Sequence, residues 1–278
     1  MSYKLCAFAD EASNAFSGQI RALVDNGIKY LEIRNLDRKN IADLSISEAK
    51  ELRKRLDDEG LSVWSVGSRI GKIGIRDDFS PHVDEFLHTL ELARALECEN
   101  LRMFSFYIPK GDSPDAYGDE AMERLGRFVE LSRGSGVTLC HENEKGIYGD
   151  VTERCLKIAK AFDEIKLVFD PANFVQCRVN TLDAWDMLRG YVKYMHIKDA
   201  LADGSIVPAG KGEGNIPTLL GKYAKIGGEV LTLEPHLVVF DGLQALEKES
   251  VKEKTFIYRY ETPEIAFKAA ADALKALI

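Results

Sequence analysis

The chain has 278 residues, of which 45% are hydrophobic and 29% are charged, and this composition excludes a disordered or fibrous protein. Its 37 Lys and Arg against 45 Asp and Glu give a formal net charge of −8, which disfavours binding to nucleic acid as the main activity. The N-terminus does not resemble a signal peptide, and no apolar run approaches the roughly eighteen residues of a membrane span. We therefore expect a soluble, cytoplasmic protein without a membrane partner, whose five cysteines stay reduced.

Short apolar or β-branched segments alternate along the chain with longer segments of helical periodicity. The short segments predict eight strands, at residues 4–8, 30–34, 62–66, 101–106, 137–142, 166–170, 194–197 and 229–234. The longer segments predict helices, which include residues 17–27, 47–60, 81–97 and 120–136. Gly27, Gly60 and Gly136 end three of these segments, where a left-handed residue is expected before the next strand.

This alternation predicts one α/β domain over residues 1–278, most simply a closed (β/α)8 TIM barrel. An open, doubly wound sheet is the alternative, but no glycine-rich GxGxxG loop follows the first predicted strand. Thr262 and Pro263 open a last helix. Residues 236–261 before it form an insertion after the eighth strand that is longer than an ordinary connection, and it is a candidate lid or association surface.

Four polar residues mark the ends of predicted strands five to eight. These residues are Glu142, Asp170, His196 and Glu234, and each follows the previous one by about one strand–helix–strand step. Barrel enzymes carry their chemistry at the carboxyl ends of the strands, so we expect the four side chains to face one opening. Any one of them alone is equally well explained as a capping aspartate, a core histidine or a polar loop residue.

Three carboxylates at one opening repel one another unless a cation balances them. Carboxylate oxygens with one imidazole nitrogen suit a divalent ion, and we expect Mn²⁺ first, with Mg²⁺, Co²⁺ or Zn²⁺ as alternatives. The sequence therefore predicts a metal centre of Glu142, Asp170, His196 and Glu234, and the competing interpretation is a purely structural polar cluster.

These residues lie in motifs that resemble the xylose isomerase-like TIM barrels, a family that includes sugar phosphate isomerases and epimerases, ketose 3-epimerases, inosose dehydratases and endonuclease-IV-type enzymes. The matching segments are LCHEN (139–143), VFDPANF (168–174), MHIKD (195–199), GKGEGNI (210–216) and TLEPH (232–236). The resemblance implies that the four residues are the metal ligands. It also implies that Glu142 and Glu234 exchange protons with carbon from opposite faces of a bound ketose.

One position departs from the family pattern. Many epimerases of the family have a histidine three residues after the strand-six aspartate, where this chain has Asn173. An asparagine can hydrogen-bond a substrate hydroxyl but carries no titratable proton. Further candidates for substrate binding or support of the site are Arg102 within the fourth predicted strand and, at other strand ends and loops, Arg34, Lys72, Lys198, Glu213 and His236.

The leading functional hypothesis is a metal-dependent isomerase or epimerase of a sugar, sugar phosphate or polyol that works through a metal-stabilised enediolate. The nearest alternative is a lyase on the same scaffold, either a dehydratase of a keto-inositol or a C-glycoside-cleaving subunit. A non-catalytic sugar-binding barrel is a further alternative, whereas the chain has too few histidines for an endonuclease-type trinuclear zinc centre. The resemblance also implies a homo-oligomer, either a dimer or a tetramer.

Overall fold

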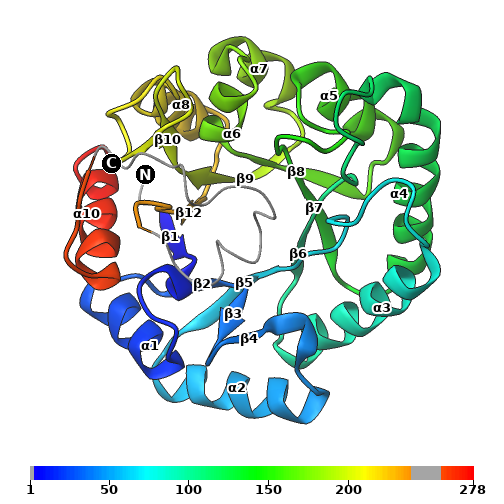
Figure 1. Ribbon diagram of the computed structural model, residues 1–278. Coiled ribbons are helices and arrows are strands. Elements are labelled where there is room, and N and C mark those ends of the chain that lie inside the picture. Colours follow the sequence, from blue (N-terminus) through cyan, green and yellow to red (C-terminus); the bar gives the residue numbers. More distant parts are fainter. Residues whose placement is uncertain (1–2, 239–257) are drawn as a thin grey trace.

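The structure is a computed structural model that describes residues 3–238 and 258–278. Eight parallel strands close into a barrel in the order β1-β12-β9-β8-β7-β6-β5-β2, with helices around the outside (Figure 1). The strands are β1 (Lys4–Ala7), β2 (Tyr30–Ile33), β5 (Ser62–Gly67), β6 (Asn100–Met103), β7 (Thr138–Glu142), β8 (Ile165–Phe169), β9 (Val192–Ile197) and β12 (Val230–Leu233). β1 pairs with both β2 and β12, which confirms the predicted closed barrel.

The helices occupy the predicted connections but end two to four residues earlier than the predicted segments. They are α1 (Phe16–Asp25), α2 (Ile46–Asp58), α3 (Ser80–Ala95), α4 (Gly118–Ser132), α5 (Thr152–Ala161), α6 (Pro171–Gln176), α7 (Thr181–Leu188), α8 (Ile216–Lys225) and α10 (Pro263–Lys275). The difference arises because Gly27, Gly60 and Gly136, with φ of 62°, 66° and 77°, form the turns after the helices.

The mouth of the barrel is reinforced where β6 ends. The predicted strand extended to residue 106, but the regular strand stops at Met103, and Phe106 adopts a left-handed φ of 68°. The backbone N–H groups of Phe104 and Phe106 bond instead to the carbonyls of Ile70 and Gly71. These bonds hold the segment after β5, residues 68–74, against the barrel.

Packing separates an apolar floor from a polar mouth. Inside the barrel, Cys6, Cys140, Val168, Tyr194 and Val230 form a buried cluster below the functional strand ends. The outer faces of the strands pack against the helices in two larger apolar clusters. Polar side chains inside the barrel are therefore concentrated at the carboxyl end of the strands, as the fold class predicts.

Two short hairpins extend loops at the mouth: β3 (Asn35–Leu36) pairs with β4 (Lys39–Asn40), and β10 (Asp199–Ala200) pairs with β11 (Ile206–Val207). Most of the predicted insertion, residues 239–257, lies outside the described residues. No helix among residues 3–238 and 258–278 is both long and apolar enough to cross a membrane. All five cysteines are free.

Candidate metal centre

Four neighbouring strands position the predicted metal ligands. Glu142 is the last residue of β7, and His196 lies near the end of β9. Asp170 and Glu234 directly follow β8 and β12. Asp170 also caps α6, because its Oδ1 accepts a hydrogen bond of 2.9 Å from the N–H of Asn173. Parallel strands direct their carboxyl ends to the same side, so the four side chains meet inside the mouth, where each is at most 2% exposed.

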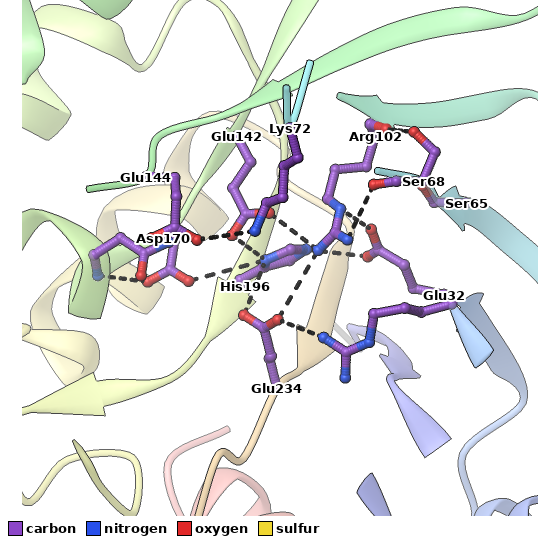
Figure 2. A network of polar contacts seen from close by, with 12 residues as sticks. Glu32, Ser65, Ser68, Lys72, Arg102, Glu142, Glu144, Asp170, His196 and Glu234 are labelled. Atoms are coloured by element: carbon purple, nitrogen blue, oxygen red, sulfur yellow. Dashed lines mark hydrogen bonds and ion pairs between the residues drawn. The ribbon is translucent and has the colours of Figure 1, made fainter. Parts of the chain in front are cut away.

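The four side chains converge as the sequence indicated. Each offers one ligand atom, and these atoms all lie within 4.8 Å of one another. His196 Nδ1 lies 3.2 Å from Glu142 Oε1, 3.5 Å from Glu234 Oε2 and 3.9 Å from Asp170 Oδ2 (Figure 2). Three carboxylate oxygens and one imidazole nitrogen at this spacing form a donor set that fits a single divalent ion. Their role as ligands stays a prediction.

Asp170 supports this fit by an independent feature. Its Oδ2 is buried and accepts no hydrogen bond from any residue that the structure describes, although Lys198 Nζ lies 2.9 Å away. Burial raises the pKa of Asp170 to about 7, despite the attraction of Lys198. A buried carboxylate oxygen is costly unless a cation balances it, and here Lys198 is that cation. The same oxygen lies 3.9 Å from His196 Nδ1, so it is also placed to act as a ligand.

Glu32 orients the histidine and was not among the residues predicted from sequence. Its Oε2 lies 3.1 Å from His196 Nε2, and its Oε1 accepts a hydrogen bond of 2.8 Å from Tyr194. When His196 is neutral and its proton is on Nε2, directed at Glu32, the Nδ1 lone pair faces the cluster, an arrangement common behind metal-bound histidines. The available signal was a single carboxylate within the apolar strand YLEIR.

Arg34 enters the mouth from the end of β2 and is held by carboxylates. It donates to Asp10 through two bonds of 2.9 and 3.0 Å, and to Glu11 and Glu234 at 3.3 Å each. Although burial opposes the charged form, Asp10 and Glu11 outweigh it and raise the pKa of Arg34. Asp10 and Glu11 also escaped the sequence prediction, because FADEAS after the first strand reads as an ordinary acidic loop.

Arg102 and Lys72 occupy the same side of the mouth. Arg102 Nη1 donates to Glu142 Oε2 at 3.1 Å, and Nη2 donates to the Ser68 carbonyl at 3.3 Å. Lys72 Nζ lies 3.4 Å from Glu144 and 4.2 Å from the centre of the Phe104 ring. Burial lowers the pKa of Lys72, an effect that Glu144 opposes.

Three other predicted site residues have different surroundings. Asn173 donates to Glu142 Oε1 at 3.2 Å, so it contacts a candidate ligand directly. His236 Nε2 lies 3.4 Å from Glu11 and 3.5 Å from Glu234. The side chain of Glu213 is exposed and forms no ion pair with the other site residues in the described part of the chain, so the structure does not bring it into the cluster.

The glycine-rich segment that contains Glu213, residues 210–216, binds the carboxylate of Asp199 through its backbone. The N–H groups of Gly210, Gly212 and Gly214 bond to the carboxylate of Asp199 at 2.9 to 3.0 Å. A Cβ on Gly212 would lie 2.4 Å from both the Ala200 carbonyl oxygen and Asp199 Oδ1, so this close approach requires glycine. The segment thus fixes the loop that follows His196 and Lys198.

Comparison with known proteins agrees with this architecture. Residues 20–253 match the family model described as xylose isomerase-like TIM barrel. The fold is similar to that of a probable 3-DHS dehydratase, AsbF, from Bacillus anthracis, with 16% identity, a TM-score of 0.75 and coverage of 99% of both chains. It is also similar to the IOLI protein with a zinc atom, with 17% identity, a TM-score of 0.76 and coverage of 99% of this chain and 97% of that chain.

A structure of L-ribulose 3-epimerase is similar at 19% identity and a TM-score of 0.74, with coverage of 100% of this chain and 94% of that chain. No match is found among curated proteins. At these identities the solved structures establish a shared fold, while the activities of those proteins range from probable dehydration to epimerisation.

Proposed function

Because the chain belongs to the xylose isomerase-like TIM-barrel family, we propose that it is a divalent-metal-dependent isomerase or epimerase of a sugar, sugar phosphate or polyol. The observation that carries this proposal is a matched pair of glutamates. Arg102 Nη1 lies 3.1 Å from Glu142 Oε2, and Arg34 Nη1 lies 3.3 Å from Glu234 Oε1. The other oxygen of each glutamate faces His196 Nδ1.

Glu142, Asp170, His196 and Glu234 would hold the ion, and Mn²⁺ is our first choice. When bound, the ion supplies positive charge beside the substrate carbonyl and makes the neighbouring C–H group more acidic. The two arginines each fix one glutamate oxygen, so the carboxylates keep a defined orientation toward the reacting carbon. Glu142 and Glu234 would remove a proton from carbon and return one, as general base and general acid.

Both glutamates are kept in the form that accepts a proton. Burial favours the neutral form of Glu142, but His196 and Arg102 outweigh it and lower its pKa to about 2. Burial likewise opposes ionisation of Glu234, yet Lys198 and His236 bring its pKa well below the ordinary range. Asn173, which contacts Glu142, would orient a substrate hydroxyl without exchanging protons.

A lyase is the second candidate. The position of Lys72 at the mouth, together with its lowered pKa, favours it. Elimination of water needs a proton donor for the departing hydroxyl. Partial burial lowers the pKa of the Lys72 ammonium group, which makes it a stronger acid than an ordinary lysine. A similar fold occurs in a probable dehydratase. Under this alternative, Glu142 or Glu234 would remove the carbon-bound proton and Lys72 would protonate the leaving group.

The test is incubation of the Mn²⁺-loaded protein in D₂O with a panel of ketoses, ketose phosphates and inososes. Incorporation of solvent deuterium at one carbon, with mass otherwise unchanged, is the expected result. Loss of water or of an aglycone would select the lyase, and metal-dependent binding without conversion would select a non-catalytic barrel. Glu142→Gln and Glu234→Gln should each lose about 10²–10⁴-fold in rate. A wild-type protein that neither converts nor binds any member of the panel would contradict the proposal.

Our proposal extends to the cellular compartment, the substrate class and the assembly of the protein. The five free cysteines agree with our proposal that the protein works in a reducing compartment such as the cytoplasm. We further propose a small-molecule carbohydrate as its partner and a homo-oligomer as its assembly.

A further inference from the structure

Two groups of candidate ligands at the barrel mouth share Glu234. The first is the cluster of Glu142, Asp170, His196 and Glu234, and the second consists of Glu11, Glu234 and His236. Each group already contains a protein cation. Lys198 Nζ lies 2.9 Å from both Asp170 Oδ2 and Glu234 Oε2, whereas Arg34 lies 3.3 Å from both Glu11 Oε1 and Glu234 Oε1.

The two cations differ in what else holds them. Arg34 forms a two-pronged ion pair with Asp10, which belongs to neither group, and its guanidinium lies 4.4 Å from the centre of the Phe8 ring. Asp10 is in turn fixed by a hydrogen bond of 2.8 Å from Asn35. A planar guanidinium in such a fork is a rigid arrangement.

Lys198, by contrast, reaches into the first group on a flexible stem. Its two ion-pair partners, Asp170 and Glu234, are both candidate metal ligands. The oxygens that contact its ammonium group are also the oxygens nearest to His196 Nδ1 in those two side chains. A divalent ion that used these oxygens would compete with Lys198 for the same place.

We propose that Lys198 is an internal counter-ion, which a single divalent metal displaces from Asp170 and Glu234, so that this lysine sets the metal affinity of the centre. Arg34 remains in place as the permanent cation of the second group, and the mouth therefore takes one ion rather than two. The physical reason is that buried carboxylates need a nearby positive charge both before and after metal binding. This inference rests on the proposed metal-dependent function.

The test compares wild type with Lys198→Met, using Mn²⁺ alone and titration calorimetry near pH 8, where competition from protons is small. Removing a positive charge next to the ion should tighten Mn²⁺ binding by about tenfold or more. The metal-free variant should melt at a lower temperature than wild type, because Asp170 and Glu234 lose their cation. The rise in melting temperature on addition of Mn²⁺ should accordingly be larger than in wild type. Stoichiometry should be one ion per chain.

Lys222→Met is the control, since Lys222 also forms an ion pair with a carboxylate, Asp186, that belongs to neither group. It should leave Mn²⁺ affinity nearly unchanged. If Lys198→Met does not fold without metal, Lys198→Gln and a Mn²⁺-bound crystal structure of wild type replace it. In that structure, Lys198 Nζ should lie beyond hydrogen-bond distance of Asp170 Oδ2.

Weaker or equal Mn²⁺ binding by the Lys198 variants, with Lys198 still contacting Asp170 in the loaded crystal, would overturn the inference. Two ions per wild-type chain would overturn the role given to Arg34. If wild type itself took up no metal, the proposed function would fail instead, so the two failures are distinguishable.

Discussion

Strands β7, β8, β9 and β12 bring three carboxylates and an imidazole to one half of the barrel mouth (Figure 2). Strands β2 and β6 and the segment after β5 bring Arg34, Arg102 and Lys72 to the other half. The first half has the donor atoms for a cation. The second half, through its arginines, donates hydrogen bonds to Glu142 and Glu234. The comparison teaches that the buried ligand carboxylates are balanced by positive charge from both halves, from Arg34 and Arg102 on one side and from Lys198 after β9 on the other.

The largest expected effect on the unfolding free energy comes from removing a cation of the second half. Arg34→Met would leave Asp10, Glu11 and Glu234 buried without their shared cation, and should cost about 3–5 kcal/mol of unfolding free energy in metal-free protein. Denaturant unfolding measures the loss. Arg69→Met is the control, because Arg69 is 43% exposed and its ion pairs should contribute about 1 kcal/mol or less. Equal losses in the two variants would contradict the account.

Metal binding by the first half is tested at Glu32, whose carboxylate contacts Nε2 of His196. Glu32→Gln keeps the shape of the side chain but removes the charge that orients His196, and should weaken Mn²⁺ binding by about 10–100-fold while the fold persists. Titration calorimetry measures the affinity. Glu144→Gln, which changes a mouth carboxylate outside the cluster, should leave it nearly unchanged. Wild-type affinity in the Glu32 variant would show that His196 needs no such support.

The packing of residues 68–74, the segment that carries Lys72, is tested at Gly71. Gly71 has a φ of 84°, and a Cβ there would lie 2.1 Å from the carbonyl oxygen of Phe104. Gly27 also has a positive φ, of 62°, but has open space around it. Gly71→Ala should therefore cost about 1–3 kcal/mol more unfolding free energy than Gly27→Ala, because the segment must move. Similar losses would mean that the segment adapts without strain.

The smallest effect lies outside both halves, at the start of α2. A hydrogen bond from the Ser45 backbone N–H lowers the pKa of Glu48 to about 2, and a hydrogen bond from Lys39 makes the next largest contribution. Because the folded-state pKa lies below the unfolded value of about 4.3, the stability from Glu48 is complete above that value and is lost as the pH falls toward 2. The difference in unfolding free energy between wild type and Glu48→Gln should shrink between about pH 6 and pH 3, and a constant difference would refute this.

The sequence was sufficient to locate the strands and the four candidate ligands. In a parallel barrel every strand delivers its last residues to the same end, so spacing alone places Glu142 and Glu234 at one end of the barrel, and the structure brings them together. The same logic placed Arg34 at a strand end, whereas Arg102 was predicted within a strand as an inward-facing guanidinium, and the structure finds both buried.

The partners of these residues could not be predicted in the same way. Glu32 lies within an apolar strand, and its contact with His196 depends on which face of β2 turns inward and on the barrel register. Asp10 and Glu11 follow β1 in a single 3-10 turn that gives no periodic signal. Glu213 was predicted near the site from its glycine-rich motif, but those glycines bond to Asp199 and leave its side chain exposed.

The central claim is that Glu142, Asp170, His196 and Glu234 hold one divalent ion, and metal analysis after Mn²⁺ loading and dialysis tests it most directly. Wild type should retain about one ion per chain, whereas Glu142→Gln and Asp170→Asn should lose most of it while circular dichroism shows an intact fold. Glu144→Gln should retain the ion. Full occupancy in both ligand variants would contradict the account.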